Sequence, residues 1–230
     1  MAKKRSKRYQ ERAQLVDRAK GYSLEEAVQS IKKINATKFD ESVAIDFQLG
    51  IRADQSDEMV RGTVVLPNGS GRQVRIVCIC KGDAAREAET AGAQEVGAEE
   101  LIKKIAEGWM EFDAVVAHPD MMRELSKLGR VLGPRGLMPS PKAGTVTPNV
   151  GRAVTELKAG KIAFKSDKTG GVHALCGKLS FAEKALLENA RALIQAVRDA
   201  KPAAARGDYL RKVTIAPTHG PGFRLTAGSY

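Results

Sequence analysis

Between residues 74 and 158, short apolar segments alternate with amphipathic ones, and this alternation restricts the possible folds more than any other feature of the chain. Three apolar segments have the length of buried strands, at residues 74–80, 93–96 and 113–117. Four segments have helical patterns, at residues 83–91, 99–108, 121–128 and 148–158. Apolar strands that alternate with helices form parallel sheets covered on both faces. The middle of the chain therefore predicts a three-layer, Rossmann-like α/β domain.

The two ends of the chain lack this regular alternation. Ser23 and Glu26 form a capping-box pair before a helix that extends to Ile34, and residues 43–51 alternate between apolar and polar. Further strands are expected at residues 61–66, 161–165, 172–177 and 209–216, and a long helix at residues 181–200. We therefore expect one α+β domain, built from residues 1–66 and 160–230, with the α/β domain inserted at residues 67–159. A hinge would fall at the two crossings between them.

Charge is distributed unevenly between these expected domains. The chain carries 38 basic and 27 acidic residues, a formal net charge of +11. The terminal domain holds 25 of the basic and 15 of the acidic residues, whereas the insertion holds 13 and 12. This excess indicates a polyanion bound by the terminal domain, and no apolar run approaches the roughly 20 residues that span a membrane. Residues 1–20 carry eight basic side chains, typical of a solvated nucleic-acid-binding arm or of a solubilising tail.

The residue types needed for a metal site or a disulfide framework are scarce. Three cysteines cannot form such a framework, and the three histidines are spread through the chain. Cys78 and Cys80 alternate along an expected strand, so both should face one way and be buried. We expect no metal and no cofactor. The first residues lack the apolar region of a signal peptide, which favours the cytoplasm.

A stretch rich in glycine and proline, residues 129–147, is expected to form a shaped loop. Its basic residues should face a nucleic-acid phosphate, and these are Arg130, Arg135 and Lys142. Its apolar residues should dock on the domain, and these are Val131, Leu132, Leu137, Met138 and Val146. The alternative is a long connection that merely closes the domain.

Three separate segments have the chemistry for contacting folded RNA, at residues 37–42, 165–173 and 218–220. Phe39 can stack on a base or sugar, and Lys165 and Lys168 can pair with phosphates. Plainer interpretations stay open for each segment. Phe39 next to a strand is often a core aromatic, residues 168–171 resemble an ordinary hairpin turn, and residues 218–221 resemble a terminal turn.

Residues 119–122 together with residues 128–147 closely resemble the signature of the bacterial ribosomal protein L1 family, and the resemblance covers nearly the whole chain. In that family the RNA-binding surface lies on the terminal domain. The resemblance implies RNA binding by Phe39, Glu41, Ser42, Lys165, Asp167, Lys168, Gly170, His173, Thr218 and Gly220. Lys38 and His219, from the same segments, complete the candidate set. The family usually has methionine at the position of His219. It also makes weaker RNA contacts through its second domain, here by Arg130, Arg135 and Lys142.

The resemblance implies a non-enzymatic protein of the large ribosomal subunit that is associated with the cytoplasmic ribosome. Such a protein binds 23S rRNA to form the mobile L1 stalk, takes part in movement and release of the exit-site (E-site) tRNA, and represses translation by binding its own mRNA. Two alternatives are weaker. A nucleotide-dependent enzyme would need a glycine-rich phosphate motif after residues 74–80, which is absent, and His118 lacks a convincing acid or nucleophile partner in the sequence. A generic nucleic-acid chaperone would bind any RNA through charge.

Overall fold

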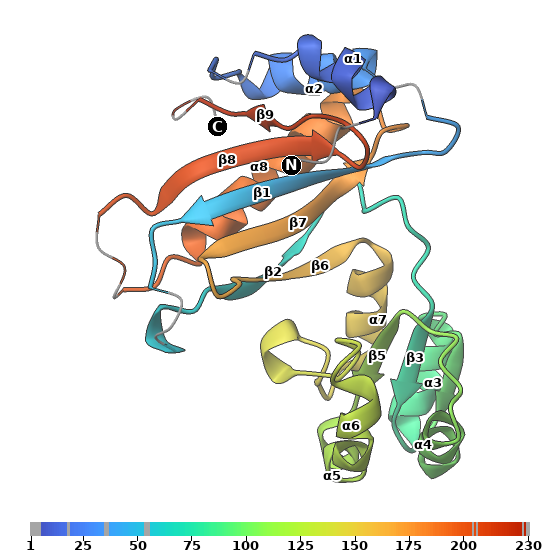
Figure 1. Cartoon of the computed structure of the whole chain (residues 1–230). Helices are drawn as coiled ribbons and strands as arrows, with labels where there is room; N and C mark the ends of the chain where they lie inside the picture. The colour runs from blue at the N-terminus through green and yellow to red at the C-terminus, as the bar shows by residue number, and fades with distance from the viewer. Residues whose placement is uncertain are drawn as a thin grey trace. The chain divides into compact units, whose positions relative to one another are not determined.

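The computed structural model describes residues 6–17, 19–34, 37–52, 56–203, 205, 207–226 and 228, which form helices and several β-sheets (Figure 1). The chain divides into two compact units. The terminal unit comprises Met1–Gly71 and Ile162–Tyr230, and the inserted unit comprises Arg72–Lys161. The expected borders, at residues 66/67 and 159/160, lie slightly before the observed ones. No helix in the described part of the chain is long and apolar enough to cross a membrane.

The terminal unit is built on a four-stranded antiparallel sheet with the strand order β7-β1-β8-β9. Its strands are β1 (Ser42–Leu49), β7 (Gly171–Lys178), β8 (Leu210–Pro217) and β9 (Phe223–Arg224). A separate two-stranded sheet pairs β2 (Arg61–Val65) with β6 (Lys161–Lys165), and a 3-10 turn, η1 (Ser56–Glu58), precedes β2. Strand β9 was not predicted, because two residues are too few to show an alternating pattern.

Helices α2 (Leu24–Lys33) and α8 (Glu183–Asp199) cover one face of this sheet, and α8 lies behind it in Figure 1. The capping box of Ser23 and Glu26 is present at the start of α2. Inward residues of β1, such as Ile45 and Phe47, are buried in one core with apolar residues of both helices. The polar residues that alternate with them lie on the opposite face, outside this apolar core.

Residues 7–14 form a further helix, α1 (Lys7–Gln14), where the sequence predicted a solvated arm or tail. The Ser6 hydroxyl caps this helix by accepting a hydrogen bond from the Tyr9 N–H. Arg12 is its one buried residue. Arg12 is therefore not solvated as an arm or a tail would imply, while residues 1–5 and Arg18 lie outside the described ones.

The inserted unit contains a three-stranded parallel sheet with the strand order β4-β3-β5. Its strands are β3 (Ile76–Ile79), β4 (Glu95–Gly97) and β5 (Ala114–Ala117), and its longer helices are α3 (Asp83–Thr90), α4 (Glu99–Ala106) and α7 (Val150–Lys158). Alternate residues of β3 enter two separate apolar clusters, one with α4 and one with α3 and α7. Cys78 and Cys80 are buried in the same cluster, as predicted.

The chain between residues 119 and 147 consists of short helical pieces rather than one helix and one loop. They are η2 (Pro119–Met121), α5 (Met122–Leu125), η3 (Ser126–Leu128), α6 (Gly129–Leu132) and η4 (Pro141–Ala143). Leu132 is buried, and Leu137 and Met138 pack on the core, as expected for an apolar underside. Val146 forms a bridge to Ala117 of β5. Val131 is exposed, so the prediction that it docks is wrong, because α6 points it away from the core.

Candidate nucleic-acid interface

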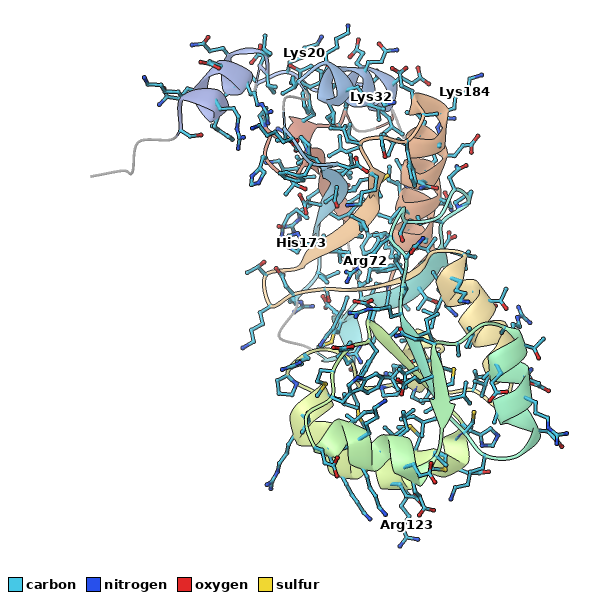
Figure 2. All side chains as sticks on the ribbon, turned by 90° about the vertical axis from the view of Figure 1, so that its right-hand side faces the viewer. Lys20, Lys32, Arg72, Arg123, His173 and Lys184 are labelled. Atoms are coloured by element: carbon cyan, nitrogen blue, oxygen red, sulfur yellow. The ribbon has the colours of Figure 1, made fainter. Side chains whose placement is uncertain are left out.

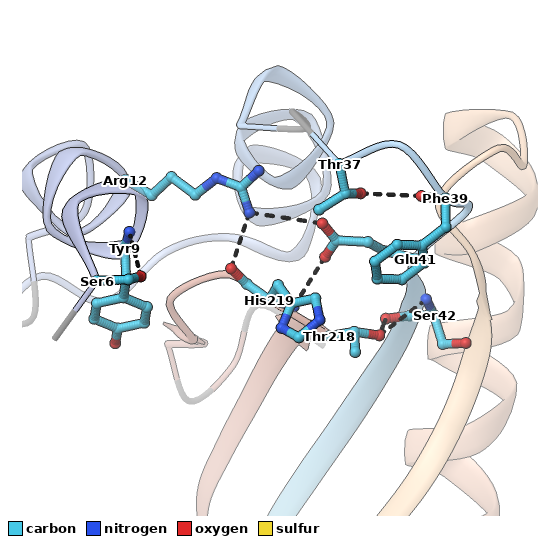
Figure 3. A network of polar contacts seen from close by, with 9 residues as sticks. All are labelled: Ser6, Tyr9, Arg12, Thr37, Phe39, Glu41, Ser42, Thr218 and His219. Atoms are coloured by element: carbon cyan, nitrogen blue, oxygen red, sulfur yellow. Dashed lines mark hydrogen bonds and ion pairs between the residues drawn. The ribbon is translucent and has the colours of Figure 1, made fainter.

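Two of the three candidate RNA-binding segments meet at one end of the four-stranded sheet (Figure 3). Strands β1 and β8 pair in antiparallel register with Val43 opposite Pro217, so residues 37–42 and 218–220 lie together. The Thr218 hydroxyl accepts a hydrogen bond from the Ser42 N–H at 3.1 Å and donates one to the Ser42 carbonyl at 3.0 Å. One side chain thus joins the start of β1 to the loop after β8. We call residues 218–220 the His219 loop.

An exposed aromatic pair lies at the same end of the sheet. The Phe39 side chain is 51% exposed, so the interpretation of Phe39 as a core aromatic is wrong. Its ring meets the His219 ring edge to face, with centroids 5.5 Å apart and an interplanar angle of 83°. Lys38 is exposed next to it. An exposed aromatic face beside a cation is suited to stacking on an unpaired base or a sugar.

A buried ion pair lies beneath this aromatic pair. Glu41 is only 1% exposed, and its Oε2 accepts a hydrogen bond from the His219 N–H at 3.0 Å. Glu41 Oε1 lies 3.6 Å from Arg12 Nη1, which also donates a hydrogen bond to the His219 carbonyl at 2.9 Å. Glu41 was predicted to contact RNA, and in this structure its buried carboxylate holds the His219 loop.

Arg12 was missed by sequence reasoning. It is one of eight basic residues among the first 20, and no local pattern distinguishes it from the others. Its contact with the His219 carbonyl joins residues 207 positions apart in the chain. A residue whose role depends on such a distant contact has no signal in a single sequence.

The third candidate segment, residues 165–173, lies at the opposite end of β1. Gly171 is paired with Gln48, whereas Ser42 is paired with Lys178. Six residues of strand separate the two ends, or about 20 Å. The structure therefore does not gather all three segments into one cluster. It places them at both ends of the face of the sheet opposite to helices α2 and α8.

Residues 167–171 form a tight turn, which agrees with the plainer interpretation of residues 168–171 as a hairpin turn. Asp167 Oδ1 accepts hydrogen bonds from the Thr169 hydroxyl and from the N–H groups of Thr169 and Gly171, and these bonds lower the pKa of Asp167 to about 2. Gly170 is buried with a φ of +77°, which favours glycine. The turn leaves the side chains of Lys165 and Lys168 exposed at its edge.

His173 links this turn to the face of the sheet opposite to helices α2 and α8. Figure 2 shows it projecting on the side away from α8. Its Nδ1 lies 2.7 Å from Asp46 Oδ1, and its Nε2 lies 3.6 Å from Asp167 Oδ2. The hydrogen bond to Asp46, followed by the contact with Asp167, raises the pKa of His173. The imidazolium form would offset two carboxylates that otherwise repel phosphate.

A shallow hollow of about 430 Å³ is centred on these groups. It is lined by Asp46, Phe47, Gln48, Asp167, Thr169, Gly171, His173, Lys212 and Thr214. The sequence-based set did not include Asp46, Gln48, Lys212 or Thr214. The alternation of residues 43–51 would have pointed to Asp46 and Gln48, because it places them on the polar side of the strand.

The remaining predicted contacts lie in the inserted unit. Arg130, Arg135 and Lys142 are exposed, which is compatible with phosphate contacts. His118 Nδ1 lies 3.2 Å from Asp120 Oδ2, an acidic partner that was not foreseen, but His118 caps the short 3-10 helix η2 by accepting a hydrogen bond from the Asp120 N–H. All three cysteines are buried. The described residues contain no group of three or more side chains arranged to hold a metal ion.

The chain matches a known protein family. The family described as "Ribosomal protein L1p/L10e family" matches residues 31–221, well over half of the chain. The match includes all three candidate segments and the exposed basic residues of the inserted unit. It does not include helix α1 or Arg12.

Proposed function

Since this chain belongs to the ribosomal protein L1p/L10e family, a family of structural ribosomal proteins and not of enzymes, we propose that it binds 23S rRNA to form the mobile stalk of the large ribosomal subunit. Membership of the family makes it a ribosomal protein that binds rRNA. The finer role in the stalk follows from the resemblance of residues 119–147 to the L1 signature. It is supported by the arrangement of exposed groups on the terminal unit.

The observation that carries the proposal is the fixed surface at the start of β1. Folded RNA is recognised through shape, 2′-hydroxyls and unstacked bases, which requires protein groups held in one geometry. The two Thr218–Ser42 hydrogen bonds and the buried Glu41 hold the exposed Phe39–His219 pair in such a geometry. At the far end of β1, Lys165 and Lys168 supply charge for phosphates. The charge excess of the terminal segments supports the same surface.

Two further roles belong to this proposal. The protein contacts the E-site tRNA as the stalk moves and takes part in its release, and it represses translation by binding its own mRNA where a similar RNA structure occurs. Both roles rest on the family resemblance. Arg130, Arg135 and Lys142 of the inserted unit would add weaker RNA contacts. We place the protein on the ribosome in the cytoplasm.

Binding measurements on two RNAs test the proposal. The purified protein is titrated with the stalk stem-loop of 23S rRNA and with a scrambled hairpin of equal length, over a series of salt concentrations. We expect a preference for the stalk RNA of at least about 10³, the lower end for specific nucleic-acid sites. Equal binding of both RNAs, with affinity that collapses as salt rises, would show counterion release alone and would favour the generic chaperone.

A further inference from the structure

Helix α1 places one of its basic residues in the interior of the terminal unit. Lys7 and Arg8 are exposed, whereas Arg12 is 5% exposed. A guanidinium is seldom buried unless its charge is paired, because it loses its hydration on burial. The buried guanidinium of Arg12 must therefore have partners inside the terminal unit.

Arg12 and Glu41 together fix both backbone polar groups of one residue, His219 (Figure 3). Arg12 Nη1 donates to the His219 carbonyl at 2.9 Å, and Glu41 Oε2 accepts from the His219 N–H at 3.0 Å. The ion pair between the two side chains closes the ring, with 3.6 Å between Arg12 Nη1 and Glu41 Oε1. Arg12 Nη2 is buried and has no hydrogen-bond partner within the described part of the chain.

The consequence extends to the exposed surface. His219 carries the ring that meets Phe39, and its neighbour Thr218 carries both hydrogen bonds to Ser42. Without Arg12, Glu41 would be a buried carboxylate without a counter-charge, and the His219 carbonyl would lose its donor. A group left buried and unpaired in this way favours rearrangement of the loop or entry of water.

We propose that Arg12 is a positioning residue for RNA recognition, which acts from helix α1 by fixing the His219 loop rather than by contributing charge to the RNA surface. This inference rests on the proposed function. It assigns to α1, which lies outside the span matched by the family, a specific part in selecting structured RNA. The basic residues around Arg12 on α1 would contribute charge alone.

Arg8→Ala provides a matched control, because it removes the same charge from the same helix at an exposed position. Binding of the stalk stem-loop and of the scrambled hairpin is measured for the wild-type protein, Arg8→Ala and Arg12→Ala. Each variant should bind the scrambled hairpin slightly less tightly and lower the salt dependence of binding to a similar small extent. Only Arg12→Ala should reduce the preference for the stalk RNA, by about tenfold, since it breaks a hydrogen bond between a charged and a buried group.

A second readout distinguishes positioning from a general loss of structure. The His219 amide should exchange with solvent faster in Arg12→Ala, while core amides of β1 such as that of Ile45 keep their protection. If Arg12→Ala is unfolded at the assay temperature, Arg12→Lys is used, since it keeps a cation near Glu41 but not the planar guanidinium. The preference of Arg12→Lys for the stalk RNA should then be lower than that of Arg8→Ala.

The outcomes separate this inference from the proposed function. If the wild-type protein shows no preference for the stalk RNA, the proposed function is wrong and the inference falls with it. If the wild-type protein shows the preference and the folded Arg12 variant keeps as much of it as Arg8→Ala, the proposed function stands and the positioning role of Arg12 is overturned.

Discussion

Thr218 connects two of the candidate RNA-binding segments directly. Its hydroxyl both accepts from and donates to the backbone of Ser42. Thr218→Val keeps the shape of the side chain and removes both bonds. We expect it to lower the free energy of unfolding by about 1 kcal/mol, since an exposed hydrogen bond contributes little, and to reduce the preference for stalk RNA about tenfold or more.

The control for this substitution is Thr90→Val in the inserted unit, where the hydroxyl donates only to the Arg86 carbonyl within helix α3. It should leave RNA discrimination unchanged. Binding of the stalk and scrambled hairpins, together with urea unfolding, measures both effects. Equal losses of discrimination in the two variants would contradict the role given to Thr218.

The raised pKa of His173, at the other end of β1, predicts that stability and RNA affinity depend on pH. Its pKa is raised by Asp46 first and by Asp167 second. A raised folded-state pKa means that the contacts contribute stability that is fully present below the ordinary pKa of 6.5 and lost as pH rises through the raised value. The contribution is small, because the His173 side chain is 65% exposed. Affinity for stalk RNA should fall over the same pH range.

The measurement is a titration of the histidine ring signals by NMR. We expect the His173 midpoint above 6.5 and a lower midpoint in Asp46→Asn. An unchanged His173 midpoint in Asp46→Asn would rule out the proposed cause.

At the residue scale, the sequence was sufficient where the exposure of a side chain depends on its immediate neighbours in the chain. Lys165 and Lys168 lie exposed at a turn, as a run of polar residues and glycines suggests. It did not foresee the burial of Glu41 and missed Arg12, because burial of both depends on contacts between the first helix, the start of β1 and the last loop. No local sequence pattern indicates that these three segments are in contact.

At the scale of elements, Asn189 links helix α8 to two other segments of the terminal unit. Its Nδ2 donates to the carbonyls of Gly69 and Cys176, and its Oδ1 accepts from the Asn68 N–H. Asn189→Ala leaves the buried Cys176 carbonyl and two partly buried backbone groups without this partner, so we expect the free energy of unfolding to fall by about 3 kcal/mol. Urea unfolding measures this change.

Gln195→Ala on the same helix is the matched control, since Gln195 is exposed and its amide donates to Asp199. A change within about 0.5 kcal/mol is expected for it. Similar unfolding free energies for the two variants would show that Asn189 does not hold the segment at residues 68–69 as described.

The elements that could be predicted were those with several repeats of their pattern. Strand β1 shows clear alternation over eight residues, and helix α8 shows a helical stripe over 17. Residues 121–128 were predicted as one helix and residues 129–147 as a loop, yet residues 119–132 form a series of short 3-10 and α-helical pieces. Strand β9 forms only because its two residues pair with Thr214 and Ile215 of β8.

At the scale of the whole molecule, the inserted unit should add affinity but not selectivity. The triple variant Arg130→Ala, Arg135→Ala, Lys142→Ala removes three exposed charges, and we expect weaker binding of stalk RNA with a shallower salt dependence. The preference for stalk RNA over the scrambled hairpin should remain within about threefold of wild type, because base and shape contacts specify whereas phosphate contacts position.

Three exposed basic residues elsewhere in the inserted unit, Arg86, Arg123 and Lys158, supply the control. Their replacement by alanine should weaken stalk binding less than the triple variant of residues 130–142 does. Equal weakening would show that the basic residues of that segment have no special contact with RNA.

Much of the architecture of the chain could be predicted from its sequence patterns. The alternation of short strands and helices between residues 74 and 117 corresponds to the parallel sheet β4-β3-β5. The order β7-β1-β8-β9 was not accessible, because pairing between the two chain ends is set by side-chain packing over long separations. The separation of the candidate segments along β1 follows from that order, so it could not be predicted from the sequence either.

The most direct test of the central claim is chemical footprinting of full-length 23S rRNA with the intact protein at physiological salt. If the His219 loop and the sheet face opposite to helices α2 and α8 recognise structured RNA, protection should be confined to one region that contains the stalk stem-loop, and Thr218→Val should weaken that protection. Protection scattered over many unrelated helices, unchanged in Thr218→Val, would contradict the account and leave binding by charge alone.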